Sequence, residues 1–112
     1  MIVNDETVKF IFNSNFKWKN YEENFEKLIL NTKEPVHVIW DFTEMNKIPS
    51  INIISKQSLL LISNKNKIKK NVLTNTVLVT SLELKNKIED IFATVYRPDS
   101  PTQVILQSAL NF

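Results

Sequence analysis

The feature that most constrains this chain is what it lacks, since none of its 112 residues is glycine. Every residue therefore carries a Cβ, and none enters the left-handed backbone region at low cost. Loops that cradle phosphates need glycine, so the P-loop, the dinucleotide fingerprint and the glycine-flanked nucleophile elbow are excluded. Asparagine tolerates left-handed backbone better than most residues. We therefore expect Asn46, Asn64, Asn66, Asn71 and Asn75 to replace glycine in turns.

Composition excludes several further classes of site. The chain has no cysteine and a single histidine, His37, so disulfides, thiolate metal sites and His-rich metal sites cannot form. We expect no metal and no cofactor. The net charge is only +2 and Arg97 is the single arginine, which disfavours nucleic-acid binding. No apolar run approaches the ~20 residues of a transmembrane segment. The absence of cysteine fits a cytoplasmic location, which we predict.

Hydrophobic periodicity predicts one α/β domain over residues 1–112. Alternating patterns indicate strands at 7–12, 36–42, 76–80 and 102–108, with a short additional strand at 1–3. Helical spacing indicates helices at about 20–31 and 51–64, and a third that begins with the capping box Thr80-x-x-Glu83. Residues 65–75 are predicted to be a polar connection. Strands joined by helices predict a mainly parallel sheet of four or five strands with three helices.

Two segments carry the strongest patterns. The strand at 36–42 (VHVIWDF) has apolar residues on both faces, which predicts a central strand covered twice. The helix that follows is expected to begin at Ser50 and to turn an apolar stripe inward. That stripe comprises Ile51, Ile54, Ser58, Leu61 and Ile62, widened by Ile53 and Leu60. Trp18 and Trp40 are expected in the core.

Residues 38–53 (VIWDFTEMNKIPSINI) resemble the strand–loop–helix signature of STAS domains, the fold of anti-anti-sigma factors. That signature has an apolar strand ending in Asp-Leu-Ser, spaced apolar residues, and an Asp-Ser-Ser-Gly-like helix start. Asp41-Phe42-Thr43 matches the first part, and Met45 and Ile48 match the spaced apolar residues. The segment 49–52 takes the place of the helix start. The resemblance implies a STAS-like fold over nearly the whole chain.

The same resemblance implies a non-enzymatic interaction module in a partner-switching or other signalling pathway. Ser50 matches the serine that a partner kinase phosphorylates in anti-anti-sigma factors, although Pro49, Ile51 and Asn52 depart from the motif. The implied partner is an anti-sigma-type kinase, a phosphatase or a sensor protein. The expected partner-binding surface comprises the loop and helix start, with Asp41, Thr43, Glu44, Asn46, Ser50 and Asn52. A phosphate on Ser50 would meet unpaired N–H groups and the helix dipole.

Blander interpretations of these residues remain open. Ser50 can be an N-cap only, and Asp41 a carboxylate that accepts loop N–H groups at the end of a strand. His37 fits a half-exposed position on the sheet. A second function class is the binding of a small molecule or lipid, which predicts an apolar pocket under a helix, whereas an enzyme is the least supported class. An edge strand or the apolar tail Leu110–Phe112 offers a surface for a homodimer.

Overall fold

The computed structural model describes residues 2–4, 6–45, 50–94 and 98–107, with backbone only for residues 2–4 and 51. It confirms the α/β class and a mainly parallel sheet. The elements in chain order are β1 (Ile2–Asn4), β2 (Thr7–Ile11), α1 (Trp18–Phe25), the π-helix η1 (Glu26–Leu30), β3 (Val36–Asp41), α2 (Ile51–Ser63), α3 (Lys65–Asn71), β4 (Val72–Val79), α4 (Leu82–Thr94) and β5 (Thr102–Leu106).

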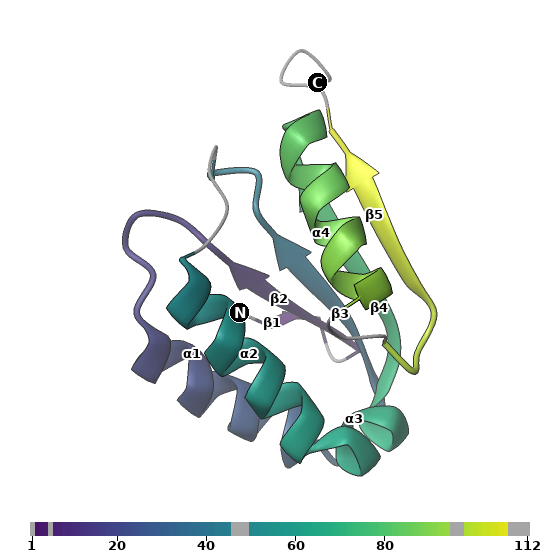
Figure 1. Ribbon diagram of the computed structural model, residues 1–112. Helices are drawn as coiled ribbons and strands as arrows, with labels where there is room; N and C mark the ends of the chain where they lie inside the picture. The colour runs from purple at the N-terminus through teal and green to yellow at the C-terminus, as the bar shows by residue number, and fades with distance from the viewer. Residues whose placement is uncertain (1, 5, 46–49, 95–97, 108–112) are drawn as a thin grey trace.

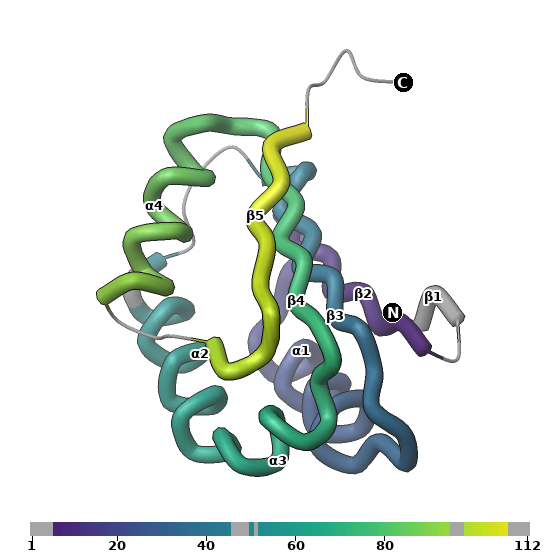
Figure 2. The backbone as a smooth tube through the Cα atoms, turned by 90° about the vertical axis from the view of Figure 1, so that its right-hand side faces the viewer, coloured from purple at the N-terminus to yellow at the C-terminus, as the bar shows by residue number. Residues whose placement is uncertain are grey.

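The five strands lie side by side in chain order, β1-β2-β3-β4-β5. The last four run parallel, and β1 pairs antiparallel with β2 at one edge. Crossover connections between parallel strands have the same hand. When the strands are neighbours in chain order, the connecting helices therefore all lie on one face of the sheet. Figure 1 shows the helices in front of the strands, and Figure 2 shows α2, α3 and α4 together on one side.

The prediction that β3 is covered on both faces is wrong. No described helix lies on the opposite face of the sheet (Figure 2). His37 and Ile39 lie on that face and are half-buried, not enclosed. His37 is tied to its neighbour strand by a 2.7 Å hydrogen bond between its Nδ1 and Thr74 Oγ1. β3 thus carries apolar residues on both of its faces, although the described helices cover only one face of the sheet.

The prediction of three helices is also wrong, since residues 65–71 form the short helix α3 where a polar connection was expected. Lysines dominate this segment, and the one apolar side chain among them, Ile68, is buried. A single inward residue gives too little periodicity to be recognised in the sequence. β4 also begins at Val72, four residues earlier than the predicted strand.

The packing under α1 follows the sequence pattern closely. Tyr21 and Phe25 of α1 and Ile29 of η1 recur every four residues, the spacing of one helical face, and all three are buried in one cluster with Phe10 of β2. Phe10 packs edge-on against Tyr21, with ring centroids 5.2 Å apart, and stacks on Trp40 at 5.1 Å. The helix begins two residues earlier than predicted, with Lys17 at the N-cap and no side-chain capping bond. Burial, more than capping, therefore holds α1.

The expected role of the asparagines is wrong for every one that the structure describes. No described residue has a positive φ. Asn64, Asn71 and Asn75 instead use their amides to satisfy other polar groups; Asn71 Nδ2, for example, donates to the carbonyl oxygens of Ile29 and Leu30. Asn46 lies outside the described residues. The cap of α4 also differs, since Ser81 Oγ, not Thr80, accepts the Leu84 N–H at 3.3 Å.

Candidate functional site

Asp41 ends β3 and is only 7% exposed. Its Oδ1 accepts hydrogen bonds from the Thr43 backbone N–H at 2.8 Å and from the Thr43 hydroxyl at 2.6 Å. Its Oδ2 lies 3.2 Å from Lys9 Nζ. Burial raises the pKa of Asp41, but the two bonds from Thr43 and the Lys9 ammonium outweigh it, so the pKa lies below its usual value. The carboxylate is thus fully engaged in holding the loop after β3, as the strand-end interpretation predicts.

The other residues of the predicted partner-binding surface are more dispersed. Ser50 is exposed at the N-cap of α2, where its Oγ accepts the Ile53 N–H at 3.3 Å. Glu44 and Asn52 are exposed, and Asn46 lies outside the described residues. Thr43 and Asp41 form a bonded pair, but no hydrogen bond in the described part of the chain joins that pair to Ser50.

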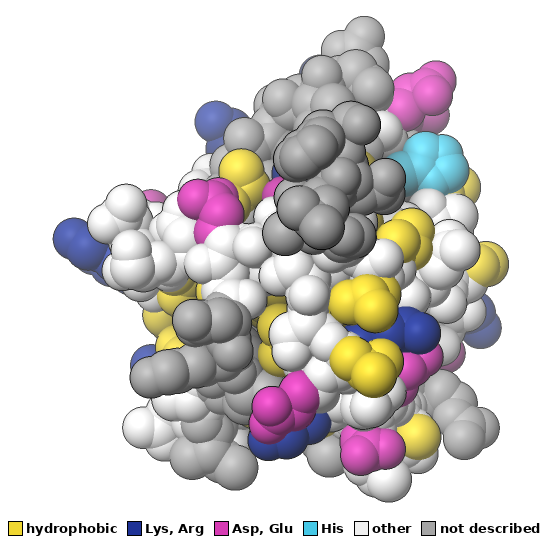
Figure 3. Space-filling model, turned by 90° about the horizontal axis from the view of Figure 1, so that it is seen from above, with side chains coloured by type: hydrophobic (Ala, Val, Ile, Leu, Met, Phe, Trp, Pro, Cys, Tyr) yellow, Lys and Arg dark blue, Asp and Glu magenta, His cyan; other side chains and the backbone are white. Residues whose placement is uncertain are grey.

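The end of the sheet where the parallel strands finish faces the viewer in Figure 3. Acidic, basic and hydrophobic side chains are mixed on this face, and no charge of one sign dominates what is visible. Nothing in its described part distinguishes it as a charged binding surface. Among the described residues, no group of three potential metal ligands occurs either.

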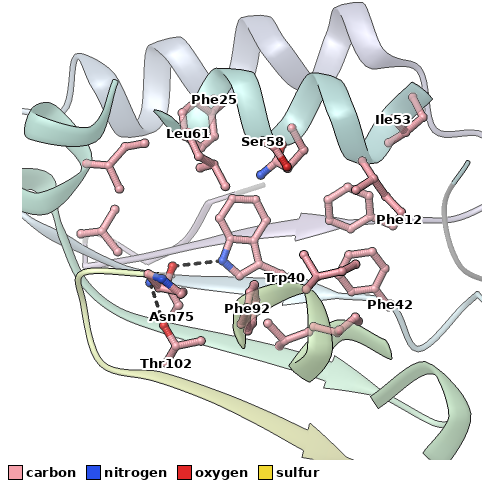
Figure 4. A pocket seen from close by; sticks show the side chains of 18 of the residues that line it. Phe12, Phe25, Trp40, Phe42, Ile53, Ser58, Leu61, Asn75, Phe92 and Thr102 are labelled. Atoms are coloured by element: carbon pink, nitrogen blue, oxygen red, sulfur yellow. Dashed lines mark hydrogen bonds between the residues drawn. The ribbon is translucent and has the colours of Figure 1, made fainter. Parts of the chain in front are cut away.

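A more distinctive feature is an apolar pocket between α2, α4 and the sheet, with a free volume of about 140 Å³. The sheet supplies its floor, where Trp40 lies at the centre beside Phe12 and Phe42 (Figure 4). Ile54, Ser58 and Leu61 of α2 form one wall, and Ile88, Ile91 and Phe92 of α4 form another. The core is therefore not solid under α2.

The loose packing of α2 explains why space remains. No side chain described on α2 is buried, although the helix has many apolar residues. Ile53, Ile54 and Leu61 turn toward the pocket as predicted. The prediction that Ile62 belongs to the inward stripe is wrong, since this side chain is 56% exposed. The small hydroxymethyl group of Ser58 occupies an inward position above Trp40 (Figure 4). A larger side chain there would fill much of the gap.

The polar atoms of the pocket floor satisfy each other. Trp40 Nε1 donates to Asn75 Oδ1 at 3.1 Å, and Asn75 Nδ2 donates to Thr102 Oγ1 at 3.4 Å (Figure 4). This chain links β3, β4 and β5 and fixes the indole ring in the floor. None of the described lining residues is charged. The arrangement therefore favours an occupant that is apolar and uncharged where it is buried.

The rim of the pocket near α1 is more polar. Trp18 lines the pocket, and the Lys56 ammonium lies 5.8 Å from the centre of its ring. Gln57 also lines the pocket, close to Tyr21 of α1. Burial raises the pKa of Tyr21 well above its usual value, while Gln57 lowers it in part. The Tyr21 hydroxyl has no well-formed hydrogen bond to a described residue. The contact between α1 and α2 is therefore incomplete.

Sequence reasoning anticipated a pocket under a helix as one alternative, but not most of its lining. Asn75 and Thr102 were missed because their partners are distant in sequence. Both tryptophans were expected in the core; both pack against it, but they are only half-buried and also line the pocket. Ser58, a polar residue inside an apolar stripe, was the available signal.

No family model, no curated protein and no solved structure matches this chain. The resemblance to STAS domains therefore rests on the sequence motif alone.

Proposed function

We propose that the protein binds an apolar small molecule, or the apolar tail of a lipid, in the pocket between α2, α4 and the sheet. The observation that carries this proposal is a free volume of about 140 Å³ whose described lining contains no charged side chain. An apolar cavity of roughly 150 Å³ is known to stay dry and to bind benzene. The pocket is thus large enough for a ring or a short alkyl chain.

Energetics favours an occupant. Protein interiors are close-packed, and few voids in them exceed the size of a water molecule. The apolar side chains that line the pocket lack packing partners on its open side, and such missing contacts cost free energy. A ligand that fills the space recovers part of this energy. Small-molecule sites in general are lined by hydrophobic and aromatic side chains with few polar groups, as this one is.

The test uses the two tryptophans that line the pocket as built-in reporters. The purified protein is titrated with n-alkanols of increasing chain length while tryptophan emission is recorded. Binding is expected to strengthen with each added methylene until the pocket is full, because each buried CH₂ contributes about 0.8 kcal/mol. Ser58→Leu, which fills the pocket, should abolish the response. Ser55→Leu, which adds the same group at an exposed position of α2, should not.

Charge gives a second arm to this experiment. An alkyl carboxylate whose head must enter the pocket should bind more weakly than the alkanol of equal length, since no described lining residue can neutralise it. An unchanged emission spectrum with every alkanol, or an equal response in the Ser58→Leu protein, would refute ligand binding in this pocket.

A second candidate function is the non-enzymatic partner switch of a STAS-like fold. It is supported by the exposure of Ser50 at the N-cap of α2, where a kinase can reach its hydroxyl. The partner would be an anti-sigma-type kinase, a phosphatase or a sensor protein. Phosphopeptide mapping of the protein from its native host tests this directly. Ser50→Asp should change partner affinity, and equal partner binding by wild type, Ser50→Ala and Ser50→Asp would exclude the switch.

A further inference from the structure

The outer surface of α2 is unusual for a helix that faces solvent. Leu59 is 65% exposed and Ile62 is 56% exposed, and neither lines the pocket. Their exposed neighbours on the same helix include Asn52, Ser55 and Ser63, none of them acidic. Two large apolar side chains thus project from a helix surface that offers them no covering partner within the described residues.

The helix that follows is strongly basic. Lys65, Lys67, Lys69 and Lys70 of α3 are all exposed. α2 ends at Ser63 and α3 begins at Lys65, so the exposed apolar residues of α2 are followed within a few residues by the lysines of α3. We call the exposed residues Leu59, Ile62, Lys65, Lys67, Lys69 and Lys70 the α2–α3 surface.

The distribution of charge along the sequence also distinguishes this surface from the rest of the chain. Residues 45–82 contain six lysines and no acidic residue, giving a charge of +6. The remainder of the chain carries a charge of −4, which is masked in the overall net charge of +2. The positive charge is thus concentrated in the segment that holds α2 and α3.

We propose that the α2–α3 surface docks on an anionic lipid bilayer, with Leu59 and Ile62 entering the headgroup region and the lysines of α3 contacting lipid phosphates and carboxylates. Apolar side chains flanked by lysines are the combination that binds such interfaces. The absence of arginine from this surface, together with its exposed apolar residues, disfavours RNA. Docking goes beyond ligand binding in the pocket, but it would place the pocket, roofed by α2, against a source of apolar molecules.

The test is a flotation assay with vesicles of phosphatidylcholine alone and of phosphatidylcholine mixed with phosphatidylserine. The wild-type protein should bind only the mixed vesicles, and binding should fall as salt concentration rises. Each lysine near an anionic membrane strengthens binding about fivefold, so Lys67→Gln with Lys70→Gln should weaken it about 25-fold. Leu59→Ser and Ile62→Ser should each weaken it about tenfold.

Matched controls use α4. Lys85→Gln with Lys87→Gln removes two lysines from that helix, and Leu82→Ser removes an apolar side chain that is 59% exposed. Neither should change vesicle binding. All these substitutions are at partly or fully exposed positions, and circular dichroism verifies that each variant remains folded. No binding to the mixed vesicles, or an equal loss in the α2–α3 and α4 variants, overturns the proposal.

The outcome is independent of the pocket, because the alkanol titration contains no vesicles. A protein that binds alkanols but not vesicles retains the pocket function and loses the docking proposal. A protein that binds vesicles but no alkanol has the reverse result. Should Leu59→Ser and Lys67→Gln weaken binding to an acidic protein while vesicle binding stays absent, the surface is a protein interface and docking on lipid is wrong.

Discussion

The helices α1 and α2 pack against the same sheet, and α1 closes the space beneath it more completely than α2 does. Tyr21 and Phe25 of α1, with Ile29 of the π-helix η1 that continues it, are buried in one hydrophobic cluster with residues of β2 and β3. No described side chain of α2 is buried, and a pocket of about 140 Å³ remains beneath the helix. Both helices carry abundant apolar residues, so apolar content alone does not determine whether a helix packs closely.

The difference lies in which side chains point inward. α1 presents large rings to Phe10, whereas α2 places Ser58 among branched aliphatic residues above Trp40. Leu59 and Ile62 of α2 point outward, so part of the apolar surface of this helix is exposed to solvent and does not fill the space beneath it. The closely packed side under α1, which we call the sealed side, and the open side under α2 therefore meet at β3. Mutations on the two sides should change the stability of the protein to different extents.

The largest expected effect comes from the same substitution made on each side. Ile29→Ala, at a position with 0% exposure, should destabilise the protein by about 2–5 kcal/mol because it creates a new cavity. Ile54→Ala, beside the existing pocket, should cost about 1 kcal/mol or less, since its side chain is only partly buried. Urea unfolding measures both.

Ile29→Val, expected to cost about 0.5–1.5 kcal/mol, keeps the comparison measurable if Ile29→Ala does not fold. Equal losses for the two alanine variants would mean that α2 is packed as closely as α1. The distinction between the two halves would then be wrong.

Substitution by a larger side chain should stabilise the protein on the open side and destabilise it on the sealed side. Ser58→Leu places apolar atoms in free space and should raise the free energy of unfolding by about 1–2 kcal/mol. Val38→Leu adds one methylene group on the sealed side, where the side chain is already buried, and should lower it by about 1–3 kcal/mol. Thermal unfolding of the two variants decides the matter. Destabilisation by both would indicate that the pocket is too small for a leucine side chain.

These contrasts also show how far the sequence could be interpreted. The strands and α1 were predictable because alternating and helical patterns are local, and because large residues such as Phe10 and Phe25 recur at the expected spacing. The helix α3 was not, because a single buried isoleucine among lysines carries no periodicity. The one-sided covering of the sheet was missed too, since apolar residues on both faces of β3 suggest burial whether or not a helix is present.

The candidate site was only partly predictable for a related reason. Asp41 and Ser50 could be assigned to the end of a strand and the start of a helix, and both occupy those places. The pocket depends on a gap between α2 and α4, and on a hydrogen-bonded chain from Trp40 through Asn75 to Thr102. Such contacts join residues far apart in the sequence, so local patterns do not report them.

The smallest expected effect concerns how each helix begins. α2 has a side-chain cap, Ser50, whereas α1 has none. If burial holds α1 and local bonds contribute more to α2, Ser50→Ala should cost about 1 kcal/mol. It should also speed amide hydrogen exchange in α2 while leaving α1 unchanged. The matched variant Lys17→Asp, which gives α1 a capping acceptor, should add at most about 1 kcal/mol and leave exchange in α2 as it was.

Hydrogen exchange followed by mass spectrometry separates these outcomes, because α1 and α2 fall in different peptides. Local opening of α2 would also admit a ligand to the pocket beneath it, so Ser50→Ala should bind alkanols faster than wild type with little change in affinity. Unchanged exchange in α2 after loss of the Ser50 hydroxyl would show that packing, not capping, holds this helix. The two halves of the molecule would then differ in volume alone and not in the forces that hold their helices.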